Sequence, residues 1–229
     1  RGRANFVWDY AQNKRTLGRF GWKANQPSLK QQTAAAFNGD MGITTSMFTN
    51  QNCPALQTDC ANTPQNKNFE LSDADLNRVV VYSQLISVPA RRELPPEIAT
   101  RGESLMRDLA CTSCHQPHFK TSAKAAFAEL RHQDIYPYTD LLVHDMGEGL
   151  ADHRPDFLAS GREWRTPPLW GIGMIKKINK HTRFLHDGRA RSLEEAILWH
   201  GGEGEASQKK YTALPKKDRD ILIQFVESL

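Results

Sequence analysis

The chain has 229 residues, a length that corresponds to one or two domains and allows a substantial core. Hydrophobic residues make up 39% and charged residues 24%, which is ordinary for a globular protein and argues against wholesale disorder. The net charge of +4 is mild and no apolar run approaches the ~20 residues of a membrane span, so we expect neither a nucleic-acid partner nor a membrane span.

The first part of the chain, residues 1–92, is predicted to contain a few helices between long loops. One helix should follow Pro27, with Ser28 as its N-cap. Cys53 and Cys60 lie seven apart in a polar loop, which favours a disulfide and therefore an oxidising compartment, although two free thiols have the same sequence pattern.

A second helix is predicted from the Ser72 cap, with Asp75 at the capping-box position and an end at Pro89. Residues 89–97 form a connector rich in proline. A helix over 97–110 then leads directly into the sequence CTSCH.

Two more helices are predicted near the C-terminus. Ser192 caps the first, with Glu195 completing a capping box, and the second covers 217–229. Its inward-facing residues are expected to be Ile221, Leu222, Phe225, Val226 and Leu229. Because alternating apolar patterns are scarce, we expect a mostly α fold with long irregular connections over 112–190.

The sequence CTSCH at 111–115 has the C-x-x-C-H spacing of haem c attachment. Two thiols can add to the two vinyl groups of one haem, and the adjacent histidine can bind the iron, so Cys111, Cys114 and His115 are the predicted haem-binding residues. A zinc site would need further ligands from a second such pair, which the sequence lacks, and a thioredoxin-type redox pair would need a βαβ context.

The second iron ligand has several candidates. His200 is favoured because it follows Leu193, Ala196 and Ile197 at offsets that place it on the apolar face of the helix capped by Ser192. His144 and Met146 are the main rivals. The other candidates are Met174, His181 and His186.

Four segments in this order resemble one known family: CTSCH, YPYTDLLVHDMGEGLAD, GREWRTPPLWGIG and RFLHDGRARSLEEAILWHGG. Together with LGRFGWKANQPSLKQQTAAAFNGDMGIT, they are similar to the C-terminal haem half of di-haem c-type oxidoreductases, also labelled thiol oxidoreductases, which are related to bacterial di-haem cytochrome c peroxidases. The resemblance covers essentially the whole chain. It implies a cytochrome c-like haem domain over 93–229 and part of a second such domain over 1–92.

The resemblance also implies roles for single residues. The distal ligand lies fourteen residues beyond the histidine of HDG, which gives His200 and a bis-His haem for electron transfer. In the same motifs, Arg165, Arg183 and Arg189 stand where cations could meet haem propionates. Relatives hold calcium by carbonyls just before HDG, where His181 to Arg183 stand, so the resemblance allows calcium.

In the first part of the chain, the resemblance assigns Trp22 to electron transfer between two haems. It places Gln32, Asp40 and Met41 at the pocket of the catalytic haem, where a carboxylate could move a proton. The alternatives are a core aromatic for Trp22, a solvated helix residue for Gln32 and a turn former for Asp40.

The family has two CxxCH motifs and this chain has one. The catalytic haem should therefore belong to a segment before Arg1, cleaved or omitted, or to a separate subunit. We expect an exported, periplasmic location and a small redox donor such as a cytochrome c or a cupredoxin. The main alternative is a mono-haem electron carrier without catalysis; thiol oxidation rests on the family label alone.

Overall fold

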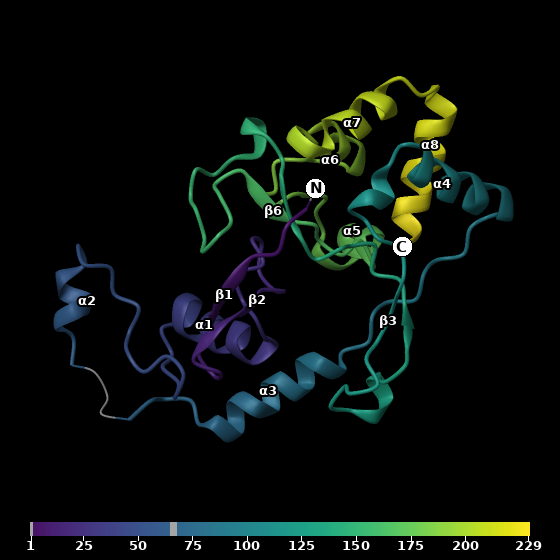
Figure 1. Ribbon diagram of the computed structural model, residues 1–229. Helices are drawn as coiled ribbons and strands as arrows, with labels where there is room; N and C mark the ends of the chain where they lie inside the picture. The colour runs from purple at the N-terminus through teal and green to yellow at the C-terminus, as the bar shows by residue number, and fades with distance from the viewer. Residues whose placement is uncertain (1, 65–67) are drawn as a thin grey trace. The chain divides into compact units, whose positions relative to one another are not determined.

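The structure is a computed structural model that describes residues 2–64 and 68–229 (Figure 1). In this part of the chain, eight α-helices and six short strands occur, so the chain is mostly α-helical, as expected. It divides into two compact units, Ala4–Ser87 and Val88–Leu229, the second of which includes the N-terminal residues through Arg3. The assignment of 1–92 and 93–229 to cytochrome c-like domains stays a prediction.

The Ala4–Ser87 unit begins with an antiparallel hairpin of β1 (Phe6–Asp9) and β2 (Lys14–Leu17), which the sequence analysis did not predict. Helix α1 (Leu29–Met41) begins where expected, because the Ser28 hydroxyl accepts a hydrogen bond from the Gln31 amide at 3.2 Å. It packs against α3 (Asp73–Leu85). The small core between them consists of Ala34, Leu76 and Val80, with Phe37, Met47, Phe48 and Leu71 at its edge.

Helix α3 has the predicted start and a shorter end. The Ser72 hydroxyl accepts from the Asp75 amide at 3.1 Å, which confirms the cap. The helix ends at Leu85 and not at Pro89, because the backbone already leaves the helical conformation at Ile86, where ψ is 123°. Leu85 and Ile86 remain exposed, as do Val81 and Tyr82.

Cys53 and Cys60 form a disulfide with Cα atoms 5.7 Å apart, which confirms the predicted clip. The bond joins the loop before α2 (Thr58–Asn62) to the middle of that short helix. It therefore closes a small loop within the Ala4–Ser87 unit.

The second unit is built around two helices that pack against each other, α4 (Pro96–Asp108) and α8 (Lys216–Ser228). A Cβ atom on Gly102 would lie 2.4 Å from the Cβ of Phe225, so this glycine permits their close approach. All five residues that were predicted to face inward are buried, four of them in α8 and the fifth, Leu229, directly after it. The rest of this core comes from α4, α6 (Leu193–Leu198), α7 (Glu205–Thr212) and loop residues.

Between α4 and α6 the chain is largely irregular, as expected. It contains α5 (Ile175–Asn179) and two small antiparallel sheets. These sheets pair β3 (Phe119–Lys120) with β4 (Asp134–Ile135), and β5 (Val143–Asp145) with β6 (Glu163–Arg165).

Helix α6 requires one correction. Its cap is as predicted, since the Ser192 hydroxyl accepts from the Glu195 amide at 3.0 Å. The helix ends at Leu198, however, so His200 lies just beyond it and not on its apolar face. The glycines at 201 and 202 explain the early end, because they favour turns over helix.

Among the helices of the described residues, none combines the length and the apolar character that a membrane crossing needs.

Candidate functional site

The CTSCH segment directly follows α4. Ala110 takes a left-handed conformation with φ of 60°, which ends the helix and starts the short 3-10 turn Cys111–Ser113. Cys111 packs against the core formed by α4 and α8, and Cys114 is partly buried. Neither sulfur is in a disulfide, so both thiols are available for attachment.

The Cys111 thiol does not have the character of a redox thiol. Burial raises its pKa to about 11, whereas reactive cysteines in redox motifs have lowered pKa values. This observation counts against a thioredoxin-type pair at 111–114.

The His115 ring is oriented by the backbone. Its Nδ1 lies 2.9 Å from the Tyr138 carbonyl oxygen, and since a carbonyl can only accept, Nδ1 carries the proton. Burial lowers the pKa of His115 to about 4 against the opposing effect of the hydrogen bond to the Tyr138 carbonyl, and the proximity of His200 contributes to this lowering. The ring is therefore neutral, with the lone pair on Nε2.

His200 has the same arrangement. Its Nδ1 donates to the Ala196 carbonyl at 2.8 Å, and burial lowers its pKa. In the part of the chain that the structure describes, no hydrogen-bond partner lies at the Nε2 of either His115 or His200. Two neutral imidazoles with available Nε2 atoms, near each other and beside two free thiols, fit the ligand set of a haem c group.

His144, one of the rival ligands, has both ring nitrogens engaged. Its Nε2 lies 2.9 Å from an Asp140 carboxylate oxygen, and its Nδ1 lies 2.9 Å from Glu203 and 3.5 Å from the Cys114 sulfur. Burial opposes protonation, but the hydrogen bonds to Asp140, Cys114 and Glu203 outweigh it and raise the pKa of His144 to about 10. A buried imidazolium of this kind has no lone pair for iron.

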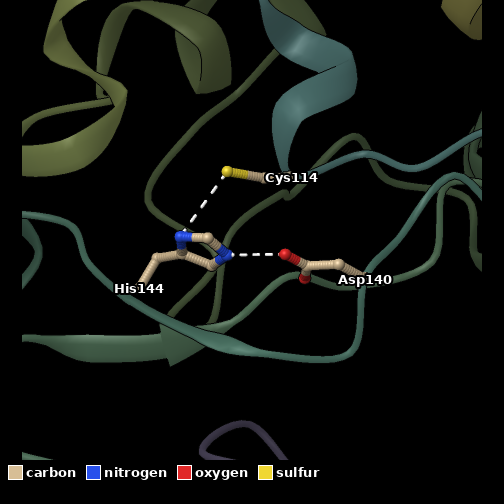
Figure 2. A group of neighbouring side chains, drawn as sticks. All are labelled: Cys114, Asp140 and His144. Atoms are coloured by element: carbon tan, nitrogen blue, oxygen red, sulfur yellow. Dashed lines mark hydrogen bonds and ion pairs between the residues drawn. The ribbon is translucent and has the colours of Figure 1, made fainter. Parts of the chain in front are cut away.

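Cys114, Asp140 and His144 also form the one cluster of metal-ligand types within the described residues (Figure 2). Cys114 and Asp140 contact different nitrogens of the ring, and so the three groups do not converge on one ion. The sequence analysis did not identify Asp140 or Glu203. Their acidic character, in YTDLLVH and HGGEG, was the only signal available.

Met146 remains an open alternative to His200. A Cβ atom on Gly204 would lie 3.0 Å from the His200 Cβ and 3.3 Å from the Met146 methyl carbon, so the two side chains approach the same glycine. The other candidates are less suitable. His181 is exposed, and His186 stacks on Trp164 with ring centroids 3.5 Å apart.

The arginines predicted near haem propionates differ in setting. Arg165 lies in β6, where burial lowers its pKa. Arg189 pairs with Asp187 at 2.5 Å, and its guanidinium lies over the ring of Trp199. Trp199 is the residue that precedes His200. Arg183 is exposed. Their roles stay predictions.

In the Ala4–Ser87 unit, the structure places Gln32 beside the turn that carries Trp22. A Cβ atom on Gly21 would lie 3.7 Å from the Gln32 Oε1. Trp22 is 53% exposed, which excludes a core aromatic. Gln32 is partly exposed, but its Oε1 is buried without a hydrogen-bond partner, which counts against a fully solvated helix residue.

Asp40 does not lie near Gln32 and the turn that carries Trp22. It lies in the last turn of α1, exposed, eight residues and therefore about 12 Å along the helix from Gln32. Met41 is also exposed. Asp40 is thus helical and not a turn residue, and its catalytic role stays a prediction.

Comparison with known protein families gives one match. The model of the family described as "Di-haem oxidoreductase, putative peroxidase" matches residues 1–229. The comparison with curated proteins gives no match, and neither does the comparison with solved structures.

Proposed function

The chain belongs to the di-haem oxidoreductase family, and on that premise we propose that it is the electron-transfer haem c portion of a periplasmic, peroxidase-like di-haem enzyme. Electrons would pass to a second haem that reduces peroxide or a similar oxidant. The observation that carries this proposal is the pair of neutral histidines, His115 and His200, whose Nε2 atoms are available beside two free thiols.

Each residue has a defined role in this proposal. Cys111 and Cys114 would hold the haem by thioether bonds, and His115 and His200 would bind its iron. A bound haem would supply one-electron redox chemistry. The carbonyls of Tyr138 and Ala196 fix the two imidazoles in the tautomer that binds a metal. With two protein ligands the iron would have no open position, which favours electron transfer over substrate binding.

The proposed partners are a second haem-bearing segment or subunit and a small redox donor protein. The 229 residues contain one CxxCH, so the second haem needs another attachment site. The exposed apolar residues of α3, among them Tyr82 at 70% exposure, support a partner surface on the Ala4–Ser87 unit. The Cys53–Cys60 disulfide supports an oxidising location. From the resemblance we further propose that calcium can bind just before HDG, at the carbonyls of His181 to Arg183.

The proposal is tested by exporting the chain in a host that attaches haem c. We expect one covalent haem on the peptide that contains Cys111 and Cys114, and a six-coordinate, low-spin spectrum. His200→Ala should convert the haem to the high-spin form, whereas Met146→Ala should leave the spectrum unchanged. A chain without covalent haem would contradict the proposal, and the opposite result for the two variants would make Met146 the ligand.

A second measurement addresses the enzyme. The protein purified from its native source, with any associated subunit, should contain a second haem in the high-spin form and should consume peroxide. A single low-spin haem in total would instead favour the mono-haem electron carrier.

A further inference from the structure

His144 joins the two segments that the proposed haem would need, yet it is not itself a suitable ligand. We propose that His144 is a positioning residue, which attaches the loop of His200 to the CTSCH segment and thereby keeps the distal imidazole on the iron. This inference rests on the proposed function, because it takes His115 and His200 as the two ligands.

His144 contacts the loop that carries His200 and Glu203, which we call the distal loop. Glu203 follows His200 by three residues, and one of its carboxylate oxygens lies 2.9 Å from the His144 Nδ1. The other accepts from the Asp145 amide at 3.3 Å. One carboxylate therefore connects the distal loop to both the side chain and the backbone of β5.

The backbones of the two segments are also in close contact. A Cβ atom on Gly202 would lie 2.3 Å from the Asp145 carbonyl oxygen, and one on Gly201 would lie 2.9 Å from the Met146 carbonyl oxygen. Residues with side chains would not fit there. The distal loop thus lies directly on the end of β5, and the pair of His144 and Glu203 adds a charged contact at this junction.

His144 also contacts the attachment segment. The Nδ1 of His144 is 3.5 Å from the Cys114 sulfur, and its Nε2 is 2.9 Å from Asp140. Asp140 is two residues from Tyr138, whose carbonyl orients His115. The stretch from Tyr138 to His144 therefore contacts the proximal histidine at one end and the distal loop at the other.

Burial on the His144 side strengthens these contacts, although the Glu203 side chain keeps 30% of its surface exposed. His144 is 4% exposed, and the side chain of Asp140 is 12% exposed. Gly2 covers the ring, since a Cβ atom there would lie 2.4 Å from the His144 Nε2. Charge-assisted hydrogen bonds in such a setting are about twice as strong as neutral ones, so the loss of one should release the loop appreciably.

The experiment uses the haem-loaded chain and three variants: His144→Ala, Glu203→Gln and the control His153→Ala. His153 pairs with Glu148 at 3.3 Å, but both side chains are about 70% exposed. This pair therefore has the same histidine–glutamate chemistry as His144 and Glu203 but is not buried. The readouts are the high-spin fraction and the rate of carbon monoxide binding to the reduced protein, which depends on release of the distal ligand.

We expect a visible high-spin fraction and about tenfold faster carbon monoxide binding for His144→Ala and Glu203→Gln, and wild-type behaviour for the control. Low-spin spectra with unchanged binding rates in both variants would overturn the inference. If His144→Ala does not fold, Glu203→Gln decides alone, because it removes only the charge of one carboxylate.

Failure of the proposed function has a different signature. In that case the wild-type chain lacks a low-spin haem, or His200→Ala leaves the spectrum unchanged. The inference about His144 fails only when the wild type and His200→Ala behave as expected and the His144 and Glu203 variants do not differ from the wild type.

Discussion

His144 is a buried histidine whose charge is maintained by two carboxylates. The pKa of Asp140 is lowered although its burial acts in the opposite direction, and the hydrogen bond from His144 is the main cause of the lowering. The pKa of Glu203 is lowered as well, again against its burial. The three groups therefore form an ionised cluster, with one cation between two anions.

This cluster predicts a pH dependence of stability. The pKa of His144 is raised to about 10 in the folded protein, above the ordinary value of about 6.5. The contribution of the charged His144 to the unfolding free energy is therefore complete below pH 6.5 and is lost as the pH rises toward 10. Between pH 6 and pH 9 the wild type should lose about 1–3 kcal/mol of unfolding free energy relative to His144→Gln, as measured by urea denaturation. The control His153→Gln should have the same pH profile of unfolding free energy as the wild type. Parallel profiles for the wild type and His144→Gln would contradict the prediction.

The spacing of CTSCH predicts Cys111, Cys114 and His115 as haem-binding residues and the resemblance predicts His200, but neither indicates the groups that orient the two imidazoles. The C-x-x-C-H pattern is local, so Cys111, Cys114 and His115 can be identified from five residues. The partner of His115 is a backbone carbonyl 23 positions later, and one partner of His144 is a glutamate 59 positions later. Such contacts depend on tertiary packing, which no local pattern encodes.

At the scale of elements, the capped helices were predictable and the strands were not. Ser28, Ser72 and Ser192 each cap a helix where expected, because the cap is a hydrogen bond within one turn. The strands have two to four residues, too short for an alternating pattern. The end of α6 was also misjudged, because the apolar spacing continued to His200 whereas the backbone turned at the following glycines.

Two glycines in helices should respond to alanine with changes in unfolding free energy of opposite sign. Gly102 lies where α4 meets α8, and an added methyl group would overlap Phe225, so Gly102→Ala should lower the unfolding free energy by about 1–3 kcal/mol. Gly39 lies in α1, where an added Cβ atom would lie 4.0 Å from the Asn52 Nδ2, an ordinary contact distance, so Gly39→Ala should raise the unfolding free energy by about 0.5–1 kcal/mol. Thermal and urea denaturation measure both changes. If Gly102→Ala left the unfolding free energy unchanged, α4 and α8 would have to be separated more widely in solution.

At the scale of the whole molecule, the two units differ in how much core they have. Val88–Leu229 has a contiguous core built from four helices, whereas among the described residues of Ala4–Ser87 the cluster between α1 and α3 contains three buried apolar residues, and the only other buried apolar side chains are Val7 and Ala24. A unit with so small a core gains little from apolar burial and depends more on covalent constraints. The Cys53–Cys60 disulfide is such a constraint.

The disulfide should therefore matter for one unit only. Replacing both Cys53 and Cys60 by serine frees a loop closed by residues seven apart, which should cost about 2 kcal/mol in the unit that contains it. Hydrogen exchange followed by mass spectrometry should show faster exchange in α2 and the loop before it. Peptides from α4 and α8 serve as the internal control and should exchange as in the wild type, and the haem spectrum should not change. Faster exchange in α8 to the same degree would instead show that the two units unfold as one.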